Sequence, residues 1–150
     1  MIILRKLEEK DFDKKYLELL SQLTDIGNNG NNDDIDMIKY KAKLKEILLN
    51  KNIEIWIIYD DVIDQIIGTG TIIIEPKLIH GCSNVGHIED IVIHNDHRNR
   101  GIGKMLLNNL VERALTNKCY KVVLFCDEKN VEFYEKCSFI RNGINMSKYF

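Results

Sequence analysis

Apolar positions along the chain follow two spacings, one that predicts strands and one that predicts helices. Short apolar runs rich in β-branched residues are typical of strands, whereas apolar residues that recur every three or four positions indicate amphipathic helices. The pattern predicts strands at Ile2–Leu7, Ile53–Tyr59, Ile66–Glu75, His87–His94 and Tyr120–Cys126, and a last strand from Phe139 that closes the sheet. It predicts helices at Glu8–Leu23, Ile35–Leu49, Gly101–Lys118 and Asn130–Lys136.

The order of these elements predicts the fold class. Strands and helices that alternate in this way make a mixed α/β sheet with helices packed on its faces. A polar stretch rich in Gly and Asn, Asp25–Asp34, predicts a loop between the first two helices, with Asp34 as the N-cap of the second. With 150 residues and neither a repeat nor a linker, the chain is expected to form one domain, residues 1–150.

Composition and charge narrow the classes of function. The net charge of −2 provides no general attraction to nucleic acid or to an acidic membrane, so any anion site has to be local. No apolar run reaches the roughly 18 residues of a membrane span, and the N-terminus lacks the pattern of a signal peptide. Cys82, Cys119, Cys126 and Cys137 form no C-x-x-C pair, which favours free thiols in a cytoplasmic protein over a metal site.

The stretch His97–Leu107, HRNRGIGKMLL, places two arginines, two glycines and a lysine at the start of a predicted helix. A Walker A loop is excluded because Met105 stands where a Ser or Thr is required, and a dinucleotide fingerprint lacks its third glycine. The unpaired N–H groups of a first helical turn and the positive end of the helix dipole suit a pyrophosphate. From the residues alone, a solvated basic turn is an equal alternative.

Two adjacent acids, Glu89 and Asp90, interrupt the apolar strand His87–His94. Successive residues of a regular strand face opposite sides of the sheet, so a β-bulge is needed to direct both carboxylates to one site. Burial of an unpaired carboxylate is costly. The residues leave two interpretations open: a salt bridge to a neighbouring Lys or Arg, or recognition of a cationic group on a ligand.

Several segments of the sequence resemble those of a known family. RNRGIGK, between a strand and a helix, resembles the acetyl-CoA pyrophosphate loop of the GNAT acetyltransferase superfamily. The segments SQLTDIG, IIIEPKLIHGC, GHIEDIVI and CYKVVLFCDEKNVEFYEKCSF resemble, in the same order, one branch of it, the glucosamine-6-phosphate N-acetyltransferases. The resemblance implies a GNAT fold, a mixed and mostly antiparallel sheet that is splayed at its fourth strand and flanked by about four helices.

The resemblance implies that acetyl-CoA is the co-substrate, with no metal, and that D-glucosamine 6-phosphate accepts the acetyl group. The pantetheine arm would pair with the backbone of the fourth strand, where a backbone N–H also meets the acetyl oxygen. The implied cofactor-binding residues are Ile91, Val92, Ile93, Arg98, Asn99, Arg100, Gly101, Ile102, Gly103, Lys104, Asn130, Tyr134 and Lys136.

The catalytic residues implied by the resemblance are Tyr134, Glu89 and Asp90. A tyrosine on a helix ordinarily packs in the core, but the family's tyrosine at this place protonates the departing thiolate, and a phenol is reasonably matched to that task. Glu89 and Asp90 would order the hydroxyls and the amine of the sugar.

The resemblance also implies a set of substrate-binding residues. Lys77 and Lys121 are natural partners of a sugar phosphate, although without the resemblance each is an ordinary surface cation. The complete set is Thr24, Lys77, His80, Glu89, Asp90, Tyr120, Lys121 and Lys148.

Two positions depart from the family's pattern. Phe125 stands where an acid is expected, which leaves the acceptor of the amine proton open among Glu89, Asp90, Asp127 and a water chain. Lys148 stands where the family's C-terminal arginine is expected to reach the sugar phosphate of the other subunit. We therefore expect a homodimer with exchanged tails; the alternative is a monomer whose tail pairs with its own sheet.

Other functions stay open at this point. A GNAT enzyme could acetylate a different amine, such as a polyamine or a protein N-terminus. A non-catalytic acyl-CoA sensor would keep the pyrophosphate loop but would need no acid at Tyr134, and the intact segment FYEK argues against it.

Overall fold

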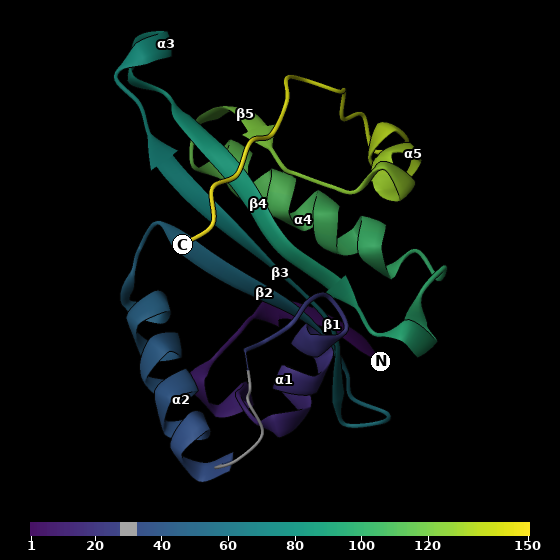
Figure 1. The fold of residues 1–150 in the computed structure, drawn as a ribbon. Helices are drawn as coiled ribbons and strands as arrows, with labels where there is room; N and C mark the ends of the chain where they lie inside the picture. The colour runs from purple at the N-terminus through teal and green to yellow at the C-terminus, as the bar shows by residue number, and fades with distance from the viewer. Residues whose placement is uncertain (28–32) are drawn as a thin grey trace.

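The computed structural model describes residues 1–27 and 33–150, which form a five-stranded sheet with helices on both faces (Figure 1). The strands lie side by side in chain order, antiparallel except for the last pair, β4 and β5, which is parallel. Their bounds are β1 Ile2–Lys6, β2 Ile53–Asp60, β3 Gln65–Pro76, β4 Asn84–Ile93 and β5 Cys119–Val123. The mixed, mostly antiparallel sheet that the sequence predicts is confirmed.

The helices cover the two faces unequally. Helices α1 and α2 pack on one face, whereas α4 runs along the other with α5 beside it, and α3 lies at the tip of the β3–β4 hairpin (Figure 1). Their bounds are α1 Lys14–Ser21, α2 Asp33–Leu49, α3 Ile79–Cys82, α4 Ile102–Thr116 and α5 Val131–Glu135. The sequence pattern found every helix in this set except α3.

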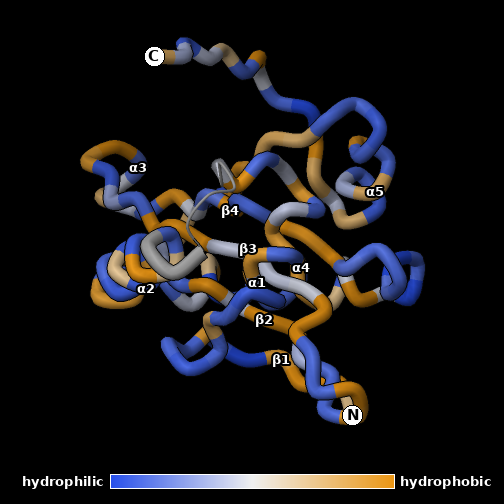
Figure 2. Tube along the Cα trace, turned by 60° about the horizontal axis from the view of Figure 1, so that its bottom comes forward, coloured by the Kyte–Doolittle hydropathy of each residue, from blue (hydrophilic) through white to orange (hydrophobic). Residues whose placement is uncertain are grey.

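Two hydrophobic cores hold the layers together, one on each face of the sheet. The larger core lies between α4 and the sheet and contains Leu106, Leu107 and Leu110, which are fully buried. The smaller core lies under α1 and α2 and includes Tyr16 and Ile57. Figure 2 shows that the sheet strands are mainly hydrophobic, while the exposed turns are mainly hydrophilic.

The first predicted helix, Glu8–Leu23, is wrong in its extent. A 3-10 turn covers Glu9–Asp11, and the α-helix starts only at Lys14. The break arises because the side chain of Asp13 accepts a hydrogen bond from the backbone N–H of Tyr16 at 2.9 Å and caps α1. Residues 28–32 of the predicted loop Asp25–Asp34 lie outside the described residues. Helix α2 already includes Asp33 and Asp34, so the loop was predicted to end too late and the prediction of Asp34 as the N-cap is wrong.

The last predicted strand, from Phe139, is also wrong. The segment from Phe139 to Phe150 contains no strand, and its apolar side chains Ile144, Met146 and Phe150 are almost fully exposed. Two left-handed residues, Ser138 and Gly143, turn the backbone away from an extended course. Figure 2 shows the tail leading away from the rest of the chain. The tail therefore does not close the sheet of its own chain.

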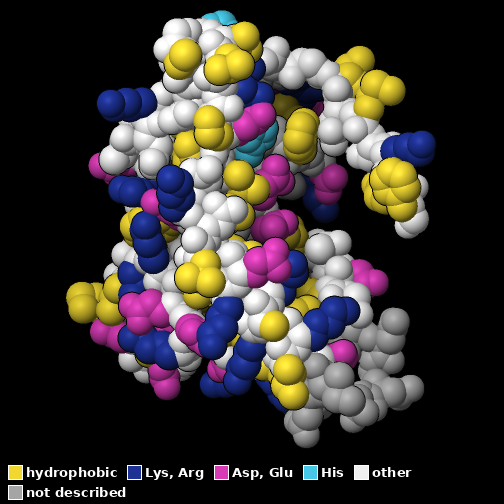
Figure 3. All heavy atoms as spheres, turned by 90° about the vertical axis from the view of Figure 1, so that its left-hand side faces the viewer, with side chains coloured by type: hydrophobic (Ala, Val, Ile, Leu, Met, Phe, Trp, Pro, Cys, Tyr) yellow, Lys and Arg dark blue, Asp and Glu magenta, His cyan; other side chains and the backbone are white. Residues whose placement is uncertain are grey.

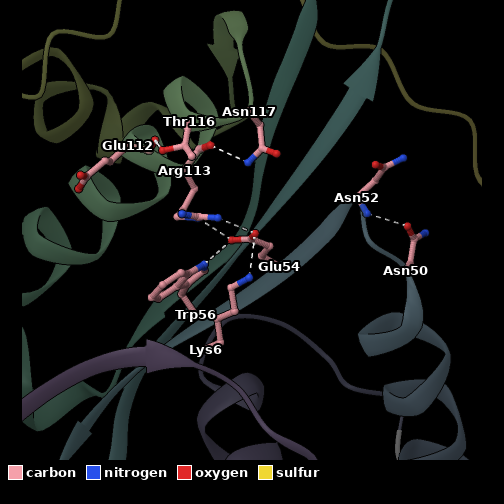
Figure 4. Close-up of polar contacts among 9 residues, drawn as sticks. All are labelled: Lys6, Asn50, Asn52, Glu54, Trp56, Glu112, Arg113, Thr116 and Asn117. Atoms are coloured by element: carbon pink, nitrogen blue, oxygen red, sulfur yellow. Dashed lines mark hydrogen bonds and ion pairs between the residues drawn. The ribbon is translucent and has the colours of Figure 1, made fainter.

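A cluster of charged side chains connects α4 to β1 and β2 of the sheet (Figure 4). Arg113 of α4 donates two hydrogen bonds to the carboxylate of Glu54 on β2, at 2.9 and 3.0 Å. Trp56 donates a third at 2.9 Å, and the ammonium of Lys6 lies 2.9 Å from the same carboxylate. Burial acts to raise the pKa of Glu54, but these donors outweigh it and hold the pKa at about 2.

Candidate active site

The two acids of β4 sit at a β-bulge. Thr69 of β3 pairs with Val92 and Thr71 pairs with Glu89, so that Gly70 alone lies opposite the two residues Asp90 and Ile91. Asp90 has a φ of 52°, in the left-handed region that a residue other than Gly seldom adopts. The extra residue breaks the alternation of the strand, and both Glu89 and Asp90 line one pocket. The predicted bulge is therefore confirmed.

This pocket, the α1–α2 pocket, has a volume of about 480 Å³ and lies between the first two helices and the sheet. Its walls are mostly apolar side chains from α1, α2, β2 and β3, and its polar groups include Thr24, Thr69 and Thr71 beside the two acids. Figure 3 shows this side of the molecule hollowed, with acidic side chains gathered at the hollow. The structure thus brings together Glu89, Asp90 and Thr24, three residues predicted to bind substrate.

The two carboxylates of the bulge have no hydrogen-bond or ion-pair partner among the described residues, so no salt bridge accounts for them there. Burial raises the pKa of the Glu89 carboxyl, the neighbouring charge of Asp90 raises it further, and His87 acts in the opposite direction. Two adjacent acids with no partner among the described residues make this part of the pocket attractive to a positive charge.

Tyr16 is a residue of the pocket that the sequence analysis did not single out. Its hydroxyl lies 3.0 Å from Oγ1 of Thr69, and burial raises its pKa to about 12. In the sequence, Tyr16 belongs to the apolar stripe of a helix and is indistinguishable from a core residue. The alternation of Thr69 and Thr71 in the apolar strand IIGTGTIIIE is the signal that marks a polar face.

The loop before α4 has the local geometry of an anion site. Asn99 and Gly101 are left-handed, with φ of 60° and 77°, and no described side chain caps the helix at Gly101. The first-turn N–H groups of α4 therefore face outward without a side-chain acceptor. Arg98 donates from Nε to the backbone oxygen of Ile93 at 3.0 Å, which fixes the loop against the end of β4.

The predicted splay of the fourth strand is confirmed. β5 pairs with β4 only from Asn84 to His87, so from Ile88 to Ile93 no strand of the described residues pairs with β4 on that side. The backbone of Ile91, Val92 and Ile93 is thus free of strand pairing along the edge that was predicted to bind the cofactor, although the C=O of Ile93 accepts the hydrogen bond from Arg98. A Cβ atom built on Gly103 would lie 3.6 Å from both Ile93 and Phe133, so the start of α4, the end of β4 and α5 meet here.

Tyr134, the predicted acid, lies half-buried on α5 against the larger core. Its ring makes edge contacts with Phe133 and Phe139, at centroid distances of 5.0 and 5.9 Å. Burial raises the pKa of Tyr134, and its hydroxyl has no hydrogen-bond partner in the described part of the chain. Such a phenol keeps its proton until a basic group comes within reach.

Two further predicted cofactor residues lie on the segment that carries Tyr134. Asn130 precedes the first residue of α5, and its side chain makes no capping hydrogen bond. Lys136, at the other end of α5, pairs with Glu132 at 2.6 Å, so it must exchange that partner before it contacts a phosphate.

The other predicted substrate residues form a second group, at the end of the β3–β4 hairpin and on β5, outside the lining of the α1–α2 pocket. The ring of His80 stacks on Tyr120 at a centroid distance of 4.1 Å, and the ammonium of Lys121 lies 5.5 Å from the Tyr120 ring centroid. Lys77 pairs with Glu75. Lys148 lies in the exposed tail and joins neither group.

Other kinds of site are not formed by the described residues. Within residues 1–27 and 33–150, no group of three His, Cys, Asp or Glu side chains is arranged to hold a metal ion. No helix in that part of the chain is long and apolar enough to cross a membrane. All four cysteines are free.

Comparison with known proteins agrees with this geometry. Residues 4–139 match the model of the acetyltransferase (GNAT) family. The chain is 36% identical over 149 residues to glucosamine 6-phosphate N-acetyltransferase 1 of Dictyostelium discoideum, covering 99% of this chain and 90% of that protein. It is 35% identical over 142 residues to the Candida albicans glucosamine 6-phosphate N-acetyltransferase, covering 95% and 91%.

Among solved structures, the Arabidopsis thaliana glucosamine-6-phosphate N-acetyltransferase superposes with a TM-score of 0.89 at 34% identity. The match covers 100% of this chain and 99% of that one. The chain therefore belongs to the GNAT acetyltransferases and, within them, to the glucosamine 6-phosphate N-acetyltransferase family.

Proposed function

We propose that this protein transfers the acetyl group of acetyl-CoA to the amine of D-glucosamine 6-phosphate and forms N-acetyl-D-glucosamine 6-phosphate. This reaction would place it in the cytoplasmic route to UDP-N-acetylglucosamine. The observation that carries the proposal is the shape of β4, which is open at one edge from Ile88 to Ile93 and bulged at Asp90. One strand thereby faces a site for an acyl donor on one side and a pocket with two unpaired acids on the other.

The donor side fits acetyl-CoA, which supplies an activated thioester when bound. The uncapped N–H groups at Gly101–Lys104, together with Arg98 and Arg100, would hold its pyrophosphate. The open backbone of Ile91–Ile93 would pair with the pantetheine arm in the manner of an added strand, and Asn130 would add a polar contact.

The acceptor side fits an amino sugar. Glu89 and Asp90 would bind the ammonium and the hydroxyl groups, and Thr24 would contribute a further hydrogen bond. Held in line, the amine attacks the thioester carbon directly, and the backbone N–H near Ile91 stabilises the charge that develops on oxygen. Tyr134 protonates the departing sulfur, a task that suits a phenol with no other hydrogen-bond partner among the described residues.

The sugar phosphate would be held by the second group, Lys77 and Lys121 with His80 and Tyr120. Lys77 would have to exchange Glu75 for the phosphate, because the two are paired in the free protein. The exposed apolar side chains of the tail support a homodimer in which each tail packs on the partner and brings Lys148 to the neighbouring phosphate.

A panel of amines tests the proposal. Release of free thiol from acetyl-CoA is measured with glucosamine 6-phosphate, a polyamine and a peptide with a free N-terminus. We expect glucosamine 6-phosphate to give the highest kcat/KM. Preference for the polyamine or the peptide would reassign the acceptor, and binding of acetyl-CoA without turnover of any amine would favour an acyl-CoA sensor.

A further inference from the structure

His87 contacts one carboxylate and shares a face of its strand with a second. Its Nε2 atom lies 2.6 Å from Oε2 of Glu75 on β3. Glu89 follows two residues later on β4, before the bulge, so His87 and Glu89 project from the same face of the strand.

The residues around His87 are two apolar side chains and several charged ones. Ile73 on β3 and Val123 on β5 stand opposite it in the sheet, and both are apolar. Its charged neighbours on this face are Glu75 from β3, Glu89 from β4, and two lysines. Lys77 donates a hydrogen bond to the other oxygen of Glu75. Lys121 lies on β5 opposite Val85, which is on the same face of β4 as His87, so Lys121 is on that face too.

Glu75 stays ionised in this arrangement. Its hydrogen bond from Lys77 and its contact with His87 lower its pKa below the ordinary value for a glutamate. An ionised Glu75 fixes the orientation of the His87 ring through Nε2. The side chain of His87 is 30% exposed, so a proton on it has a path to solvent.

The reaction needs such a group. An amine enters as an ammonium, which has no lone pair and cannot attack a thioester until it loses a proton. Proton transfer is most efficient when the acceptor titrates near the working pH, and histidine is the side chain that ordinarily does so between pH 5 and 8. Phe125 carries no ionisable group, which leaves this role open.

We propose that His87, held by Glu75, receives the proton that the substrate amine releases and that Glu89 relays this proton to it. The inference rests on the proposed acetyl transfer. An N–H bond of the ammonium breaks, its electron pair stays on nitrogen, Glu89 takes the proton, and His87 takes it from Glu89 through one intervening water. The nitrogen then forms the N–C bond as the C–S bond breaks. Tyr134 gives its phenol proton to the sulfur. The second proton lost by the amine nitrogen restores the phenol of Tyr134, and His87 releases the first proton to solvent.

The test is the pH dependence of His87→Gln. We expect kcat/KM for glucosamine 6-phosphate to fall by about 10²–10⁴-fold at pH 7, the usual size of general-base effects. The deficit should shrink to less than about tenfold at pH 9.5, because an amine comparable to an α-amino group, which titrates at about 7.7–8.0, then arrives neutral. A merely structural role would give the same deficit at both pH values.

Further variants complete the experiment. Imidazole added to His87→Ala should restore part of the lost rate, and Glu75→Gln should show a smaller deficit with the same pH dependence. Glu9→Gln, which breaks an exposed ion pair with Lys45 at 3.2 Å, is the matched control and should keep the wild-type profile. Thermal midpoints of all variants establish that the fold is intact.

The outcomes separate the two proposals. If wild-type protein does not acetylate glucosamine 6-phosphate, the proposed function is contradicted and the inference is overturned with it. If the wild type is active but His87→Gln keeps full kcat/KM at pH 7, or loses the same factor at pH 7 and pH 9.5, the inference alone is overturned.

Discussion

Glu54 and Glu89 are the same residue type on two strands of one sheet, yet their environments are opposite. Glu54 faces α4 and contacts Arg113, Trp56 and Lys6, which hold its pKa at about 2 (Figure 4). Glu89 faces the α1–α2 pocket with no such partner among the described residues, and burial raises its pKa.

The difference teaches how to read an acid in an apolar strand. An acid whose partners come from the neighbouring strand and helix contributes to the stability of the fold, because its interactions form when the chain folds. An acid left unpaired beside a pocket costs stability, and the cost is offset only when a ligand binds. The same contrast separates two tyrosines, since Tyr16 is hydrogen-bonded to Thr69 and Tyr134 is without a described partner.

The largest effect is expected when both pocket acids are neutralised. In the double variant Glu89→Gln, Asp90→Asn, kcat/KM for glucosamine 6-phosphate should fall by about 10²–10⁴-fold, because each charged hydrogen bond contributes about 1.5–3 kcal/mol. Urea unfolding should show equal or higher stability, since two adjacent like charges are removed. A clear loss of stability with unchanged turnover would reverse our assignment of these acids.

Removal of the hydroxyl groups of Tyr134 and Tyr16 should have different effects, one on activity and the other on stability. Tyr134→Phe should lower kcat by about 10²-fold if the hydroxyl protonates the sulfur, with little change in the affinity for acetyl-CoA. A pre-steady-state measurement is the safer assay, because product release can mask a slower chemical step. Tyr16→Phe should instead cost about 1 kcal/mol of stability through its lost hydrogen bond. Full kcat in Tyr134→Phe would show that another group protonates the thiolate.

Neutralisation of the paired acid should affect stability alone. Glu54→Gln should lower the free energy of unfolding by about 1.5–3 kcal/mol, because charge-assisted hydrogen bonds to Arg113 and Lys6 are weakened. The kcat per folded molecule should stay at the wild-type value, measured by thiol release below the unfolding transition. A large fall in kcat with unchanged stability would show that Glu54 takes part in catalysis and would contradict its structural role.

The smallest expected effect is the pH dependence of the stability difference between the wild type and Glu54→Gln. The pKa of Glu54 is about 2 in the folded protein and 4.5 for an unperturbed glutamate, so the unfolded chain takes up the proton first as the pH falls. The stabilisation is therefore complete above about pH 4.5 and is lost toward pH 2. After allowance for solvent screening, about 1–2 kcal/mol should disappear in this window. Urea midpoints of wild type and Glu54→Gln should converge there; a constant gap would contradict the shift.

Hydrophobic spacing predicted the strands because one or both faces of each are buried against a core. It failed where a local or distant contact decides the structure. The side chain of Asp13 ends the run that looked like one helix, and α3 depends on the left-handed residues His80 and Gly81, which no periodicity encodes. The tail carries strand-like residues but forms no strand pairing with the described part of its own chain.

The candidate site was predictable to a different degree. The need to turn Glu89 and Asp90 to one side indicated the bulge, and the basic, glycine-containing loop indicated the start of α4. The contribution of Tyr16 and the pairing of His87 with Glu75 were not predictable, because they join residues 53 and 12 positions apart in sequence through the packing of the sheet.

The central claim is that the unpaired carboxylates belong to an acceptor site for an amino sugar phosphate. The ratio of kcat/KM for glucosamine 6-phosphate to kcat/KM for unphosphorylated glucosamine tests it most directly. A charge-assisted phosphate contact contributes about 1.5–3 kcal/mol, so this ratio is expected to be at least about tenfold. Equal values for the two sugars would contradict the claim and would point to an acceptor without a phosphate.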